Sequence, residues 1–110
     1  MRSVVKLAMA GLGLALAASP QAVAADAPQR IVSLNLCTDQ LLVDLVAAER
    51  IAGVSVLGSD PSLSADAQRL APFPKLSGSA EEVLALKPDL VIAGEYTTGA
   101  TVDLLRRLGQ

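Results

Sequence analysis

The segment SGSAEEVLALKPDLVIAG, residues 77–94, limits the possible folds of this chain more than any other stretch. Ser79 and Glu82 have the spacing of a capping box, in which each side chain satisfies a backbone N–H at the start of a helix. We predict a helix with Lys87 in its last turn, because the proline that follows cannot continue it. Residues 90–93 then predict a strand that is buried on both faces.

The same alternation of strand and helix extends toward the N-terminus. Residues 30–34 and 51–55 are short runs rich in β-branched residues, and they predict two more buried strands. Between them, residues 38–49 have helical periodicity, with Thr38 as the N-cap. The predicted inward face of this helix consists of Leu41, Leu42, Leu45, Val46 and Ala48, and the outward face of Asp39, Asp44 and Glu49.

Residues 57–74 are dense in Gly, Ser, Asp and Pro and predict a loop, with a short helix at 64–70. A final helix is expected from 98 to 108, capped by Gly109, with Val102, Leu105 and Leu108 facing inward. The whole pattern predicts an α/β fold, a Rossmann-like parallel sheet flanked by helices. Because the chain stops where the next strand is expected, we interpret it as one lobe of something larger.

The N-terminal residues have the order of charge and hydrophobicity that is typical of a secretory signal. Arg2 and Lys6 precede an apolar run, residues 7–18, that is too short to span a bilayer. Small residues at 22 and 24 predict cleavage before Ala25. We therefore predict a signal peptide at 1–24, a short linker at 25–29, an N-terminal α/β lobe at 30–110, and a periplasmic location.

Composition excludes several classes of function. The predicted mature chain has seven basic and eleven acidic residues, a net charge of −4, so nucleic acid and anionic membranes are poor partners. The chain has no histidine and one cysteine, Cys37, so we predict no disulfide, no metal site, no cofactor and no catalytic residue. Lipid attachment at Cys37 is disfavoured, because Leu36 is bulky and the apolar run is distant.

Three strand-to-helix junctions are candidate binding loops: Asn35 to Thr38, Ser77 to Ala80, and Gly94 to Thr98. In an open parallel sheet, ligands bind where the carboxyl ends of the strands meet the starts of the helices. Free backbone N–H groups at these starts suit polar ligand atoms. We interpret Cys37 as a small residue in the wall of this cleft.

Four segments in order, RIVSLNLCTDQLL, ERIAGVS, GSAEEVLALKPDLVIAG and LLRRLG, carry a resemblance to a known family. They resemble the N-terminal lobe of the substrate-binding proteins of cobalamin and ferric-siderophore ABC importers. The resemblance extends from Arg30 to Gly109. Its most specific piece is LALKPDLVIAG, because a helix stopped by Lys-Pro-Asp and followed at once by a buried strand recurs at this place in the family.

The resemblance implies one lobe of a two-lobed class III periplasmic binding protein, a monomer without enzymatic activity. The implied partners are a small-molecule ligand, an iron–siderophore, haem or cobalamin, and an ABC permease at the inner membrane. Glu81 matches the family position that docks on permease arginines. The implied ligand-facing residues lie in four cleft loops, and those we single out are Asn35, Leu36, Cys37, Thr38, Ser55, Ser77, Gly78, Glu95, Tyr96 and Thr97.

The chain departs from the family pattern because the bridging helix and the second lobe are absent, which puts autonomous capture and transport in doubt. Two alternatives therefore stay open. One is an exported α/β enzyme fragment that uses the Cys37 thiol, and the other is a truncated product without activity. Replacing Cys37 by serine separates the first alternative from ligand binding, since a wall residue tolerates this change.

Overall fold

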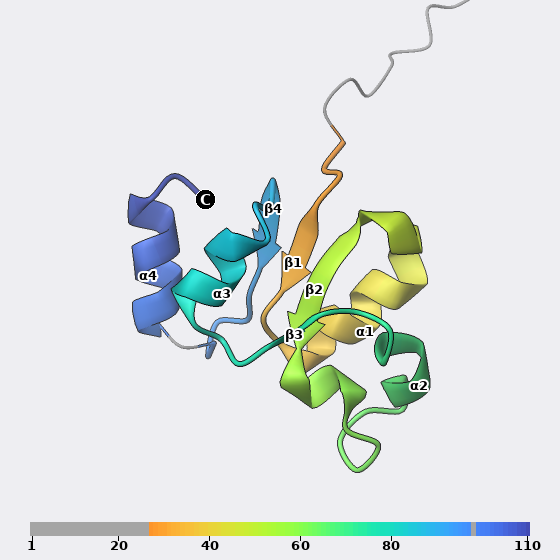
Figure 1. Ribbon diagram of the computed structural model, residues 1–110. Coiled ribbons are helices and arrows are strands. Elements are labelled where there is room, and N and C mark those ends of the chain that lie inside the picture. Colours follow the sequence, from red (N-terminus) through yellow and green to blue (C-terminus); the bar gives the residue numbers. More distant parts are fainter. Residues whose placement is uncertain (1–26, 98) are drawn as a thin grey trace, which may run out of the picture.

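The computed structural model describes residues 27–97 and 99–110. The predicted signal peptide and its cleavage site lie outside the described residues, as does Thr98. The described chain forms a four-stranded, all-parallel sheet flanked by helices, so the predicted Rossmann-like α/β fold is confirmed (Figure 1). Within these residues, no helix combines the length and the apolar character needed to cross a membrane.

The sheet has the strand order β3-β2-β1-β4. Its strands are β1 (Ile31–Ser33), β2 (Ile51–Ser55), β3 (Lys75–Leu76) and β4 (Leu90–Ile92). The sequence predictions missed β3, because residues 75 and 76, which follow the predicted loop at 57–74, were assigned to no element. Two residues are too few to show a strand period, and their pairing with Val54 and Ser55 is long-range information.

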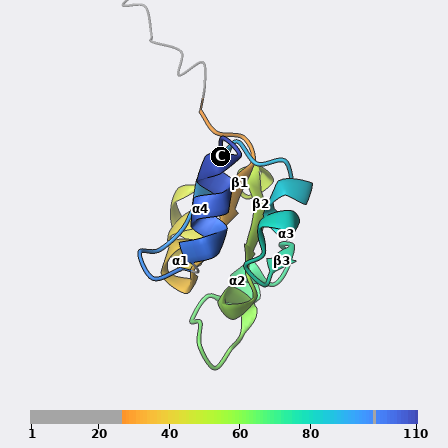
Figure 2. The same cartoon turned by 90° about the vertical axis from the view of Figure 1, so that its left-hand side faces the viewer.

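Helices cover both faces of the sheet (Figures 1 and 2). One face carries α1 (Leu36–Leu45) and α2 (Ala67–Leu70), and the other carries α3 (Ala80–Ala85) and α4 (Gly99–Arg107). Because side chains alternate along a strand, Ile31 packs in a cluster with Leu42 and Leu70. Val32 packs on the opposite face with Val83 and Leu105. The hydrophobic core is thus divided into two parts by the sheet.

Helix α1 begins earlier than predicted, and its N-cap is Asn35 rather than Thr38. The Asn35 side-chain oxygen accepts a hydrogen bond from the Cys37 N–H at 2.9 Å. Asparagine caps helices as readily as threonine does, and the prediction at Thr38 placed the N-cap three residues too late. The helix also ends at Leu45, before the predicted limit at Glu49, because the backbone becomes extended at Val46.

The predicted faces of α1 are partly wrong. Leu42 and Val46 pack inward, but Leu41 and Leu45 are exposed, and Ala48 lies in the exposed 3-10 turn η1 (Ala48–Arg50). Asp39, predicted on the outer face, is fully buried. The inward face follows the 39–42–43–46 spacing, so the carboxylate replaces an apolar residue in the first turn.

The capping box at the start of α3 is present as predicted. The helix ends at Ala85, however, and Lys87 lies beyond its last turn with a left-handed backbone (φ 47°). The following strand β4 is not buried on both faces: Leu90 is exposed, and Val91 and Ile92 are half-buried. The reason is its position, since β4 pairs with β1 and forms one edge of the described sheet.

Two further helix predictions are corrected in part. The predicted helix at 64–70 is reduced to α2, a single turn at its end. In α4, Leu105 is buried and Val102 half-buried, but Leu108 is exposed because the helix ends at Arg107. Gly109 adopts φ 83°, the left-handed conformation expected of a C-terminal glycine cap.

Candidate functional site

The order of the strands creates a switch point between β1 and β4. The chain passes from β1 to β2 and β3 on one side, and then returns to place β4 on the other side of β1. In open α/β sheets, ligands bind at the carboxyl ends of the two strands where the direction of winding reverses. The loops at this end, residues 35–38, 55–59, 77–80 and 94–97, lie along the lower edge in Figure 1, and we call them the carboxyl edge.

Asn35 and Gly94 are in direct contact at the switch point. A Cβ atom built on Gly94 would lie 2.8 Å from Asn35 Nδ2 and 3.3 Å from Thr97 Oγ1. Thr97 Oγ1 also accepts a hydrogen bond from the Gly94 N–H at 2.8 Å. The first and last predicted junctions are therefore brought together, and the absence of a side chain at Gly94 allows this approach.

A cavity of about 210 Å³ opens beside this contact. The loop after β4 contributes Gly94, Glu95 and Thr97, and α4 contributes Gly99, Val102, Asp103 and Arg106. Sequence reasoning missed the α4 residues as site residues. These α4 residues are three, one and three positions apart, which places them on one face of the helix. The spacing would have identified them as site residues once α4 was known to start at the carboxyl edge.

The loop after β1 supplies three more predicted residues. Leu36 is half-buried and Cys37 is exposed in the first turn of α1. Thr38 Oγ1 donates to the Asn35 carbonyl oxygen at 2.9 Å and lies 2.6 Å from Ser33 Oγ. Thr38 therefore stabilises the loop from within, whereas Cys37 presents its side chain to solvent.

Ser55, at the end of β2, is turned into the protein rather than toward the edge. It is buried, its N–H donates to Asp39 Oδ1 at 3.1 Å, and its Oγ donates to Asp39 Oδ2 at 2.5 Å. The exposed residues of this loop are instead Val56 and Leu57, in the 3-10 turn η2 (Val56–Ser59). Asp39 thus joins α1 to the loop after β2.

The loop after β3 is held by the capping box. Ser77 donates through its N–H (2.9 Å) and its Oγ (2.8 Å) to Glu82 Oε2. The pKa of the Glu82 carboxyl is lowered mainly by the hydrogen bond from the Ser77 hydroxyl. Hydrogen bonds from backbone N–H groups of the same loop lower it further. Gly78 has φ 103°, and its carbonyl oxygen accepts from Thr101 Oγ1 of α4 at 2.8 Å.

Glu81, beside the carboxyl edge, and Tyr96, within it, are exposed to solvent. Glu81 is exposed in the first turn of α3, next to the capping Glu82. Tyr96 is 94% exposed in the loop between β4 and α4, where Glu95 is also exposed. These side chains remain available for contacts outside the described chain.

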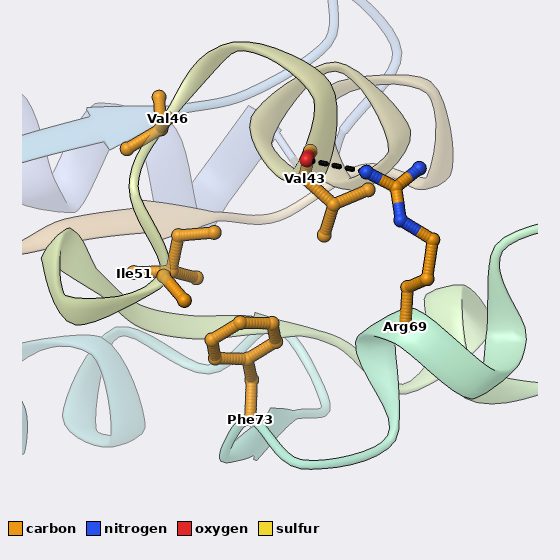
Figure 3. Close-up of a pocket in the computed structure, with 6 residues that line it drawn as sticks. Val43, Val46, Ile51, Arg69 and Phe73 are labelled. Atoms are coloured by element: carbon orange, nitrogen blue, oxygen red, sulfur yellow. Dashed lines mark hydrogen bonds between the residues drawn. The ribbon is translucent and has the colours of Figure 1, made fainter.

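A second hollow, of about 190 Å³, lies at the opposite end of β2 (Figure 3). Its wall is formed mainly by Val43, Val46, Ile51 and Phe73, and Arg69 closes one side by donating to the Val43 carbonyl oxygen at 2.6 Å. No predicted site residue lines it. The hollow is a gap between the end of α1, the start of β2 and the α2–β3 connection.

The side chains of the carboxyl edge are mostly uncharged. The chain contains no histidine, and among the described residues no three Cys, Asp or Glu side chains are grouped to hold a metal ion. The edge offers amides, hydroxyls, one carboxylate, one thiol and several apolar side chains. This set can hold a ligand by hydrogen bonds and apolar contact.

Comparison with known proteins gives one distant similarity. The chain is 27% identical over 81 residues to the uncharacterized ABC transporter substrate-binding lipoprotein YvrC of Bacillus subtilis (strain 168). The match covers 74% of this chain and 25% of that protein, so the chain spans about a quarter of its relative. No protein-family profile matches the chain, and no solved structure matches it. The chain is therefore distantly similar to an ABC transporter substrate-binding lipoprotein.

Proposed function

We propose that this chain is the first lobe of an extracytoplasmic substrate-binding protein of an ABC importer. Its carboxyl edge would hold an iron–siderophore, haem or cobalamin ligand against a second lobe. The contact of Asn35 with Gly94 at the switch point carries the proposal, because it joins two predicted binding loops beside a cavity. The similarity to a substrate-binding lipoprotein supports the transport role.

Binding by the chain itself tests this proposal. Native mass spectrometry of the mature chain, mixed with a panel of corrinoids, haem and ferric chelates, should detect a one-to-one complex. Replacing Tyr96 by alanine should weaken that complex about fivefold, the effect of losing one aromatic contact. Leu45→Ala is the matched control, because Leu45 is also exposed (77%) but lies at the far end of α1. Equal losses in both variants, or no complex at all, would contradict the proposal.

Cys37 has a passive role in this proposal. Its thiol is exposed and the chain offers no histidine to activate it. Cys37→Ser should therefore leave ligand affinity within twofold. A loss of binding or of any hydrolytic activity in this variant would favour the thiol-dependent enzyme instead.

Within the same proposal, Glu81 is the permease-docking residue. It is exposed, and Glu82 rather than Glu81 satisfies the helix start, so its carboxylate is available for an arginine partner. In vesicles that contain the importer, Glu81→Ala should reduce uptake while ligand binding is retained. Glu49→Ala, a matched carboxylate at the opposite edge in η1, should leave uptake unchanged. Unaltered uptake with Glu81→Ala would refute the docking role.

A further inference from the structure

The basic side chains are distributed unevenly between the two ends of the sheet. Those near the amino ends of the strands are Arg30 before β1, Arg50 before β2, Lys75 at the start of β3, and Lys87 before β4. The carboxyl edge, residues 35–38, 55–59, 77–80 and 94–97, contains neither lysine nor arginine. A ligand at this edge therefore meets no cationic side chain from the loops themselves.

Three arginines lie on the neighbouring helices, and two of them, Arg69 and Arg106, are already paired with carboxylates. The third, Arg107, lies in the last turn of α4, at the end of the helix away from the carboxyl edge (Figure 1). Arg106 lines the cavity at the switch point, and its Nη1 lies 3.6 Å from Asp103 Oδ1 on the same helix. Arg69 of α2 lies 2.7 Å from Asp44 and 2.9 Å from Asp66. Because each positive charge has a negative partner, neither arginine gives this end of the lobe a net positive charge.

Carboxylates, by contrast, project from the same end. Glu95 lines the cavity, Glu81 stands beside the loop after β3, and Asp60 follows η2, all of them exposed. Each helix start contributes roughly half a positive charge. Asp39 in α1 and the two glutamates in α3 offset this charge at two of the three starts.

Large apolar side chains are exposed on these same loops. Val56 and Leu57 are 47% and 46% exposed on η2, and Tyr96 is 94% exposed after β4. Asn35 and Thr97 add uncharged polar groups beside them. The edge thus combines apolar area, neutral hydrogen-bonding groups and a small excess of negative charge.

We infer that the carboxyl edge accepts an uncharged or cationic metal complex with apolar surface and rejects a polyanionic one, an inference that rests on the proposed function. A polyanion bound here would lose hydration without gaining a cationic partner and would face like charges. Arginine is the usual partner of clustered carboxylates and phenolates, and the arginines nearest to this edge, Arg69 and Arg106, are paired with aspartates. Two classes of ligand fit this description: a metal trishydroxamate chelate and a corrinoid.

Chemical-shift titration of the ¹⁵N-labelled mature chain tests this inference. The probes are a cationic gallium trishydroxamate with a pendant ammonium group, cyanocobalamin, and a gallium triscatecholate with three negative charges. Gallium replaces iron to avoid paramagnetic broadening. One of the first two should bind at the carboxyl edge at least tenfold more tightly than the triscatecholate. Which of the two binds distinguishes the chelate from the corrinoid.

A charge reversal isolates the electrostatic cause. Glu95→Lys should strengthen triscatecholate binding about fivefold at low salt, because a trianion interacts with a new charge across roughly one Debye length. The same change should weaken a cationic trishydroxamate about twofold. Glu49→Lys is the matched control, since it adds the same charge at the amino end of β2 and should change neither affinity by more than twofold.

The outcomes separate the inference from the function on which it rests. Tighter binding of the triscatecholate at the carboxyl edge overturns the inference and leaves the proposed function standing. Equal effects of Glu95→Lys and Glu49→Lys also overturn it, because the local charge then has no role. If no probe binds more tightly than about 1 mM, or if the shifts map to the hollow around Phe73, the proposed function fails and the inference fails with it.

Discussion

Asp39 of α1 accepts two hydrogen bonds from Ser55 of β2, one from the backbone N–H at 3.1 Å and one from the hydroxyl at 2.5 Å. The carboxylate is fully buried, and it also lies against Gly58, where a Cβ atom would meet Asp39 Oδ2 at 2.6 Å. This pair fixes the start of α1 to the loop after β2. Two loops of the carboxyl edge therefore depend on one buried carboxylate for their relative position.

Removing the Asp39 carboxylate should destabilise the fold. Asp39→Ala leaves the buried Ser55 N–H without an acceptor, and we expect it to lower the free energy of unfolding by about 3 kcal/mol. Ser55→Ala keeps the N–H bond and should cost about 1–2 kcal/mol. Urea denaturation of both single variants and the double variant measures the coupling, expected to be at least about 1 kcal/mol. Strictly additive losses would show that the two side chains act independently.

The role of Asp39 marks a limit of prediction from sequence. An aspartate in the first turn of a helix is usually a surface residue that favours the helix dipole, and this local rule predicted exposure. Its real partner is 16 residues away, on a strand whose position depends on the tertiary fold. In contrast, Ser79 and Glu82 are three residues apart, so the capping box was predictable from local spacing alone.

The helix start at α3 should make stability dependent on pH. The hydrogen bond from the Ser77 hydroxyl, with further backbone N–H bonds, holds the pKa of Glu82 below its ordinary value of 4.5. A lowered carboxyl pKa stabilises the fold above that ordinary value, and the contribution is lost as the pH falls through the folded pKa. Glu82→Gln should therefore flatten the decrease in stability between about pH 5 and 3 in urea titrations.

Two comparisons complete this test. The pKa of Asp89 is lowered by hydrogen bonds, first from the Gln29 N–H and second from the Arg30 N–H. Because of Asp89, the stability of the Glu82→Gln variant should still decrease in part at low pH. Ser79→Ala should cost about 1 kcal/mol at neutral pH, the usual value of an N-cap. An acid profile that is unchanged by Glu82→Gln would contradict the proposed linkage.

The C-terminal end of α3 should depend on Arg30. The Arg30 guanidinium donates from Nη2 and Nε to the Leu86 carbonyl oxygen at 2.5 and 3.0 Å, and from Nε to the Lys87 carbonyl oxygen at 3.3 Å. Arg30→Ala leaves these terminal carbonyls to water and should lower the unfolding free energy by about 1–2 kcal/mol. Arg30→Lys should recover only part of the loss, because an ammonium lacks the planar fork.

Arg107→Ala is the control for Arg30, since Arg107 is exposed in the last turn of α4. Its removal should change the unfolding free energy by less than about 0.5 kcal/mol. Comparable losses in the two variants, measured by urea denaturation, would mean that net charge rather than the specific contacts of Arg30 explains the effect.

The candidate site was predictable as a set of loops but not as an arrangement. Parallel strands place all their carboxyl ends at one edge, so the junctions after residues 34 and 93 could be named in advance. Which two loops touch depends on strand order, and the sequence does not state that β4 returns to the free side of β1. The missed strand β3 and the inward turn of Ser55 have the same origin, because both follow from long-range pairing.

The approach of α1 to the loop after β4 should be sensitive to a single methyl group at Gly94. In Gly94→Ala, the added Cβ would come within 2.8 Å of Asn35 Nδ2, so the Asn35 amide must move. That movement breaks its bond to the Cys37 N–H, which costs about 1 kcal/mol of stability. We expect a large shift of the Cys37 amide signal and about tenfold weaker ligand binding.

Gly99→Ala is the matched control, because a Cβ atom there meets nothing within 4 Å and alanine favours the first turn of α4. This variant should keep both the Cys37 signal and the ligand affinity, and should be slightly more stable than the parent chain. If Gly94→Ala binds ligand as well as Gly99→Ala, the switch point is not where the ligand sits, since the two glycines line the same cavity and only Gly94 lies against Asn35 and Thr97.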